Sequence, residues 1–157
     1  MLIRPSVLDT AIPPPVAMLL VGAAMWAVAH ALPWFTYALP LRTPVAILVG
    51  IVGLLCNLLP KLRFSRVGTT VNPMRPQAAR HLVIDGLHRY SRNPMYLGQL
   101  LLLVAWAIFL ANGLAMTLPP LFVLYITRFQ ILPEERALAA GFGDAYATYR
   151  GQVRRWL

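Results

Sequence analysis

Four long apolar stretches constrain the fold of this chain more than any other feature of its sequence. They cover residues 16–32, 45–59, 94–110 and 114–132. About 20 apolar residues cross a bilayer as a helix, and a backbone exposed to lipid must satisfy its own hydrogen bonds. We therefore predict an all-α fold, a multi-pass membrane bundle of about four transmembrane helices that forms one domain over residues 1–157.

The distribution of charge predicts how this bundle lies in the membrane. The chain carries 14 Lys and Arg against 5 Asp and Glu, and seven of the cations lie in the connection at residues 61–93 with Asp85 as its only acid. Cytoplasmic loops are enriched in Lys and Arg. We therefore predict that this connection, the helical tail at residues 133–157 and both termini are cytoplasmic, in the plasma or inner membrane if the source is bacterial.

The net charge of +9 indicates an anionic partner, either a nucleic acid or the headgroups of a membrane. Nucleic-acid-binding domains are basic, but here the cations flank apolar stretches, which favours the anionic headgroups of lipids. The sequence therefore predicts the lipid bilayer as a partner and no nucleic acid. It leaves the oligomeric state open.

Prolines and glycines predict where the helices end, bend or meet. Pro60 is expected to close the second apolar stretch, and the Pro119–Pro120 pair is expected to bend or delay the fourth helix. Gly50 and Gly53 allow close approach of a neighbouring helix. Gly143 is expected to end or kink the helix of the tail.

A polar segment at residues 86–98 directly precedes the third apolar stretch. It contains two arginines, a histidine and two tyrosines. Asn93 suits the N-cap of the following helix, and Pro94 suits its first turn. A helix start of this kind favours a carboxylate or phosphate ligand. Alternatively, Arg89 and Arg92 only reach the lipid headgroups.

A second polar group, the pair Glu134 and Glu135, follows the fourth apolar stretch. The turn at residues 111–113 is so short that the last two spans form an antiparallel hairpin, which returns this pair to the membrane face of residues 86–98. The carboxylates suit a helix start or a charge partner for nearby arginines. Together with aromatic walls from Tyr90, Tyr96, Phe142 and Tyr146, they also suit a nucleoside-bearing cofactor with a sulfonium cation.

The two polar groups together carry a family resemblance. Residues 86–98 read G-L-H-R-Y-S-R-N-P-M-Y-L-G, and after the hairpin the pair E-E is followed at residues 142–149 by F-G-D-A-Y-A-T-Y. This arrangement resembles the isoprenylcysteine carboxyl methyltransferase and phospholipid methyltransferase superfamily over about residues 69–156. His88 and Asn93 stand where the family usually has tyrosine and often has histidine, respectively.

The resemblance implies methyl transfer from S-adenosylmethionine, at the cytoplasmic membrane face, to a lipophilic or small acceptor, with no metal. The positions that correspond to cofactor-binding residues are Arg80, His81, Leu82, Val83, His88, Arg92, Asn93, Pro94, Met95, Tyr96 and Glu134. Glu135 is a candidate catalytic base. Arg128 is a second catalytic candidate, as the basic residue nearest to Gln130, which stands where enzymes acting on prenylated cysteine carry a substrate-contacting arginine.

Two other classes of protein are weighed against this interpretation. NADPH-dependent membrane reductases of sterol or enone lipids look similar in their C-terminal hairpin, but they are much longer than this chain. A non-catalytic membrane scaffold has no need for costly polar groups at the ends of its spans. The sequence does not identify the methyl acceptor.

Overall fold

The computed structural model describes residues 9–67 and 82–157, and every element named in these residues is a helix. The predicted sites Arg80 and His81 lie outside the described residues. The longer helices are α1 (Pro14–Ala31), α2 (Arg42–Val67), α3 (Pro94–Leu110), α4 (Pro119–Ile126) and α5 (Leu132–Gln152). Shorter helical segments are η1 (Pro33–Phe35), η3 (Gly86–Arg89), η4 (Ala115–Thr117) and the π-helical η5 (Thr127–Ile131).

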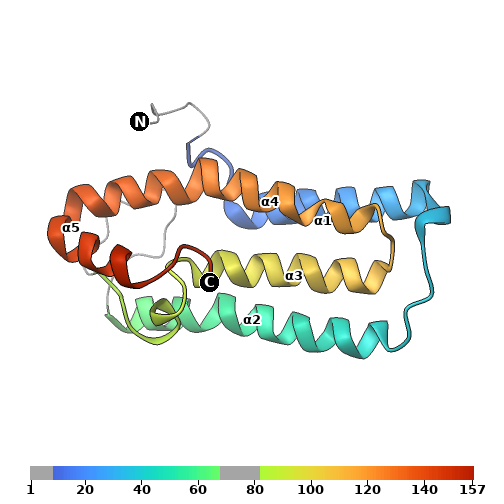
Figure 1. Cartoon of the computed structure of the whole chain (residues 1–157), viewed down its shortest axis with the longest axis horizontal. Coiled ribbons are helices and arrows are strands. Elements are labelled where there is room, and N and C mark those ends of the chain that lie inside the picture. The colour runs from blue at the N-terminus through green and yellow to red at the C-terminus, as the bar shows by residue number, and fades with distance from the viewer. Residues whose placement is uncertain (1–8, 68–81) are drawn as a thin grey trace.

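The helices form an elongated bundle in which α3 packs against α1, α2 and α4 (Figure 1). Its core is built from fully buried apolar side chains such as Met25 of α1 and Phe122 of α4. Three helical stretches, Pro14–Ala31, Arg42–Arg63 and Ala115–Gln152, are long and apolar enough to cross a membrane, and α3 is a shorter apolar helix. The predicted all-α, multi-pass membrane fold is therefore confirmed.

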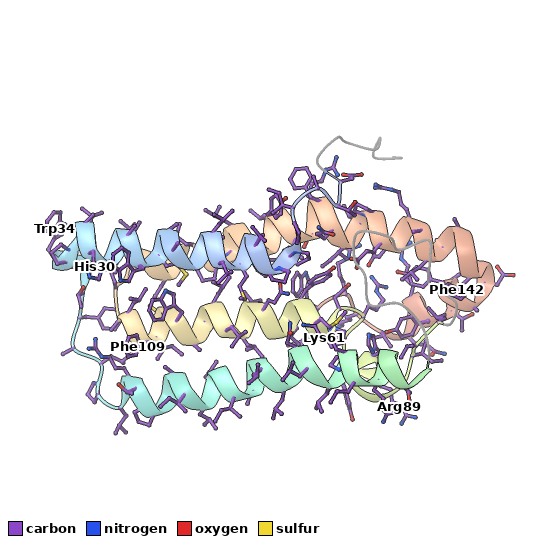
Figure 2. The ribbon with its side chains drawn as sticks, turned by 180° about the vertical axis from the view of Figure 1, so that it is seen from behind. His30, Trp34, Lys61, Arg89, Phe109 and Phe142 are labelled. Atoms are coloured by element: carbon purple, nitrogen blue, oxygen red, sulfur yellow. The ribbon has the colours of Figure 1, made fainter. Side chains whose placement is uncertain are left out.

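The two ends of the bundle differ in chemistry. Figure 2 shows Trp34 at one end and Arg89 toward the other, with Lys61 between them on the side of Arg89. The exposed surface of α2 between these ends is apolar, with Leu48 63% and Ile51 51% exposed. A surface of this kind is stable when lipid covers it, because apolar area in water costs free energy.

Gly53 and Gly98 let α2 and α3 cross with their backbones in contact. A Cβ atom on Gly98 would lie 2.6 Å from the carbonyl oxygen of Gly53 and 2.6 Å from the backbone nitrogen of Asn57. The predicted close approach at Gly53 is therefore confirmed. The side-chain amide of Asn57 donates a hydrogen bond to the Met95 carbonyl at 3.1 Å. This bond opposes sliding of α2 along α3.

The second helix does not end at Pro60, as the sequence predicted, but continues to Val67 with Pro60 inside it. Side chains of the additional turns form polar contacts. Lys61 donates to the Asn57 side-chain oxygen at 2.7 Å, and Arg63 pairs with Asp85 at 2.6 Å. These contacts offset the backbone hydrogen bond that the proline removes.

The two predictions for the C-terminal half are confirmed. The double proline delays α4, which begins at Pro119 after the short turn of η4. Gly143 has φ 50° and ψ −125° inside α5, and this left-handed conformation kinks the helix. The kink folds the end of the chain back toward the start of α3 (Figure 1).

Candidate functional site

The polar segment before α3 and the glutamate pair of α5 meet through the side chains of Tyr96 and Glu134. The Tyr96 hydroxyl donates a hydrogen bond to Oε1 of Glu134. Tyr96 is only 4% exposed, and Glu134 is partly buried. The hairpin of α3 and α4 thus brings the two sequence motifs together at one end of the bundle, as predicted from the short turn between them.

Glu135 forms a different kind of contact, an ion cluster with two arginines. Arg92 donates from Nη2 to Oε1 at 2.9 Å, and Arg155 donates from Nε and Nη2 to the two carboxylate oxygens at 3.0 and 2.8 Å. The side chains of Arg92 and Glu135 are only 9% and 10% exposed. Burial acts to raise the pKa of Glu135, but the hydrogen bond from Arg155 and the charges of both arginines outweigh it and lower this pKa below its ordinary value, so the carboxylate stays charged at neutral pH.

The last residues of the chain close over the start of α3. The backbone N–H of Arg92 donates to the Arg154 carbonyl at 3.0 Å, and the guanidinium of Arg92 donates to the Arg150 carbonyl at 3.0 Å. Asn93 occupies the N-cap position, but its side chain does not cap α3 as predicted; it donates to the Arg155 carbonyl at 3.0 Å. The backbone N–H of Asn93 donates to the Ser91 hydroxyl instead, at 3.1 Å.

His88 lies in η3, in contact with the last turns of α5. Its backbone carbonyl accepts a hydrogen bond of 2.7 Å from the Tyr149 hydroxyl. Burial lowers the pKa of the His88 imidazole to about 4, against an opposing effect of Asp85. The imidazole is therefore neutral at pH 7 and contributes hydrogen-bonding capacity to the site but no charge.

The other predicted cofactor-binding residues lie at the same end of the bundle. Leu82 and Val83 are partly buried ahead of η3. Pro94 is buried in the first turn of α3, and the carbonyl of Met95 is bonded to Asn57 of α2. Pro94 and Met95 directly precede Tyr96 in the first turn of α3.

Arg128, predicted as a catalytic residue, is placed elsewhere. Its guanidinium pairs with Asp9 at 3.2 Å and lies 5.1 Å from the centre of the Phe129 ring. In the part of the chain that the structure describes, no hydrogen bond or ion pair joins it to Glu134 or Glu135. A catalytic role for Arg128 thus stays a prediction that these contacts do not support.

A shallow cavity of about 380 Å³ runs along α5 around its kink. Small residues line most of it, and Tyr146 and Arg150 supply an aromatic face and a cation. The carbonyl of Arg150 is the one that Arg92 binds, so the cavity adjoins the ion cluster of Glu135. Its volume lies within the range of small-molecule pockets.

Sequence reasoning missed the contribution of Arg155 and Asp9 to this region. Each is a charged residue near an end of the chain, and each binds a partner more than 15 positions away. No motif or helical spacing marks such a pair. The signal that the sequence does contain is its scarcity of acids: five carboxylates among 14 cations are all candidates for ion pairs.

Comparisons with known proteins cover most of this site. Residues 41–145 match the phospholipid methyltransferase family, which is about two thirds of the chain and includes both Tyr96 and Glu134. A protein of Haemophilus influenzae described as uncharacterized is 49% identical over 63 residues, which are 40% of this chain and the whole of that protein. On the strength of the family match, this chain belongs to the phospholipid methyltransferase family of membrane proteins.

Proposed function

We propose that this protein is an S-adenosylmethionine-dependent methyltransferase that modifies a lipophilic or small acceptor at the cytoplasmic face of a membrane. The observation that carries the proposal is the hydrogen bond between Tyr96 and Glu134. It joins the two halves of the family motif at the charged end of an apolar bundle. The family match supports methyl transfer, and the chemistry of the residues supports this cofactor.

The side chains present fit the parts of S-adenosylmethionine. Glu134 can accept hydrogen bonds from the ribose hydroxyls, and the faces of Tyr96 and Tyr146 suit an adenine ring or a sulfonium. Arg92 has a buried Nε–H without a hydrogen-bond partner among the described residues. A buried donor of this kind is costly unless a ligand satisfies it, and the carboxylate of the cofactor would do so beside the start of α3.

The chemistry divides between the cofactor and the chain. When bound, S-adenosylmethionine supplies a methyl group that its sulfonium charge activates. The chain's own residues bind, orient and exclude water: Glu134 and Tyr96 hold the nucleoside, and the C-terminal segment over α3 shields the site. Glu135 is occupied by Arg92 and Arg155, so we assign it a role in positioning Arg92 and not that of a base.

The position of the site at the end of the spans favours a lipophilic acceptor. α1 and α2 expose apolar side chains along their length, such as Leu19 and Leu48. A molecule dissolved in the bilayer can therefore reach the start of α3 without leaving the membrane. Its reactive atom would approach from the apolar side, whereas the cofactor would enter from the charged side.

The test is isothermal titration of the detergent-purified protein with S-adenosylhomocysteine, with NADPH titrated in parallel. We expect micromolar binding of S-adenosylhomocysteine alone. Glu134→Ala should abolish this binding while the protein still inserts in membranes. Asp144→Ala, which removes an exposed carboxylate of the same helix, is the matched control and should bind normally.

Each other outcome has a definite meaning. Binding of NADPH alone would place the protein with the membrane reductases. Binding of neither ligand by folded protein would favour a non-catalytic scaffold. Normal binding by Glu134→Ala would remove Glu134 from the site.

A further inference from the structure

The helix that carries Glu134 is irregular directly before it. Residues Thr127–Ile131 form a π-helical segment, and Pro133 follows two residues after its end. In an α-helix the carbonyl of Phe129 would accept from the N–H of residue 133, but proline has none. The carbonyl is instead bound from outside: the backbone N–H of Thr10 donates to it at 2.8 Å.

Asp9 spans the same irregularity with its two carboxylate oxygens. Oδ1 accepts from Arg128 at 3.2 Å, and Oδ2 accepts from Arg136 at 2.6 Å. Arg128 lies before Pro133 and Arg136 lies after it. The Asp9 side chain is only 12% exposed, so water screens these two ion pairs less than it would at an open surface.

A third contact comes from Ile12. Its carbonyl accepts a hydrogen bond of 2.8 Å from the side-chain amide of Gln130, which is completely buried. Residues 9–12, which we call the N-terminal strap, therefore hold the π-helical segment through a backbone bond, a buried amide and two ion pairs. Figure 1 shows this part of the chain against the helix where α4 passes into α5.

We propose that the N-terminal strap positions Glu134 for cofactor binding and that Asp9 is a positioning residue of this site. Each residue of an α-helix turns the chain by about 100°. A change of register in the π-helical segment would therefore rotate Glu134 away from the Tyr96 hydroxyl. The strap prevents that change, because its bonds to Phe129 and Gln130 and its ion pairs across Pro133 fit one register. The inference rests on the proposed function only in its reference to a cofactor.

The experiment compares Asp9→Asn, which removes the charge and keeps the shape, with Asp9→Glu, which restores the charge. Asp144→Asn, at an exposed acid of α5, is the matched control. The first measurement is the distance between spin labels on Leu62→Cys in α2 and Ala140→Cys in α5, in a Cys56→Ser background. The second is titration with S-adenosylhomocysteine in the unlabelled proteins.

We expect Asp9→Asn to shift or broaden the distance between the labels. We also expect it to weaken binding of S-adenosylhomocysteine by about fivefold, at the low end of couplings between separate sites. Asp9→Glu should recover both values in large part, and Asp144→Asn should change neither. Arg136→Gln, which breaks one of the same ion pairs from α5, provides a second variant and should move the distance in the same direction.

Unchanged distances in Asp9→Asn and Arg136→Gln would overturn the proposal. A lower melting temperature with an unchanged distance would also overturn it, because the strap would then stabilise the fold without affecting the position of α5. If the unmodified protein does not bind S-adenosylhomocysteine but the distance moves in both variants, the proposed function fails while the control of α5 by Asp9 stands.

Discussion

The neighbouring glutamates of α5 should respond to the same substitution to different degrees, because their partners differ. Glu135→Gln leaves Arg92 and Arg155 without their anion, and Arg92 is almost completely buried. Breaking a buried ion pair by removing one partner typically costs about 3–5 kcal/mol. Arg155 is 31% exposed and regains water, so we expect the lower end, a loss of about 3 kcal/mol in the free energy of unfolding.

Glu134→Gln provides the matched comparison one residue away. Its amide oxygen can still accept the hydrogen bond from Tyr96, and no arginine among the described residues pairs with Glu134. We expect it to lower the free energy of unfolding by less than about 1 kcal/mol. Because the amide is a weaker acceptor for ribose hydroxyls than a carboxylate, Glu134→Gln should weaken binding of S-adenosylhomocysteine more than Glu135→Gln does.

The assay is reversible unfolding in mixed detergent micelles, combined with titration of S-adenosylhomocysteine on the folded variants. A double variant, Glu135→Gln with Arg155→Gln, should lose less stability than the two single losses added together, because both remove the same ion pair. Equal losses of stability in Glu134→Gln and Glu135→Gln would refute the reasoning. So would additive losses in the double variant.

Two further predictions concern the frame of the site. Gly98→Ala should destabilise the protein by about 2 kcal/mol, because the added methyl group would lie 2.6 Å from the backbone of α2. Gly141→Ala is the control: a methyl group there has no neighbour within 4 Å and should not destabilise the protein. Thermal unfolding of both variants checks this prediction. His88 has a folded-state pKa of about 4 against an ordinary 6.5, so its neutral form stabilises the protein above pH 6.5. Up to about 3 kcal/mol of this is lost as the pH falls from 6.5 to 4, and the free energy of unfolding of His88→Gln, measured at pH 7.5 and 4.5, should fall less than that of the unmodified protein.

The helices and the meeting of the two motifs could be predicted from the sequence because both follow from local rules. Apolar stretches of sufficient length must become helices in lipid. A three-residue turn at residues 111–113 must return α4 along α3, and this brings Glu134 to the level of Tyr96. Gly143 could likewise be identified as a kink, because glycine adopts a positive φ at little cost.

The contacts that complete the site could not be predicted in this way. Arg155 reaches Glu135, and the Tyr149 hydroxyl reaches the His88 carbonyl, across long sequence separations that no periodicity marks. The prediction that the second helix ends at Pro60 was wrong for a related reason. A proline ends a helix only where the residues after it form no stabilising contacts in the helical conformation. Here the helical conformation lets Lys61 donate a hydrogen bond to Asn57, so the helix continues.

The polar groups at the opposite end of the bundle differ from those of the candidate site at the start of α3. Asn112 is completely buried there, and both polar atoms of its side-chain amide are hydrogen-bonded. Nδ2 donates to the Leu32 carbonyl at 3.0 Å and to the Thr36 hydroxyl at 3.2 Å. Oδ1 accepts from the N–H of Ala115 at 3.1 Å. A group whose bonds are used within the chain has a structural role. At the start of α3, by contrast, Arg92 keeps a buried N–H without a partner among the described residues. Because an unsatisfied buried donor is costly, this contrast supports our proposal that the charged end of the bundle receives the ligand.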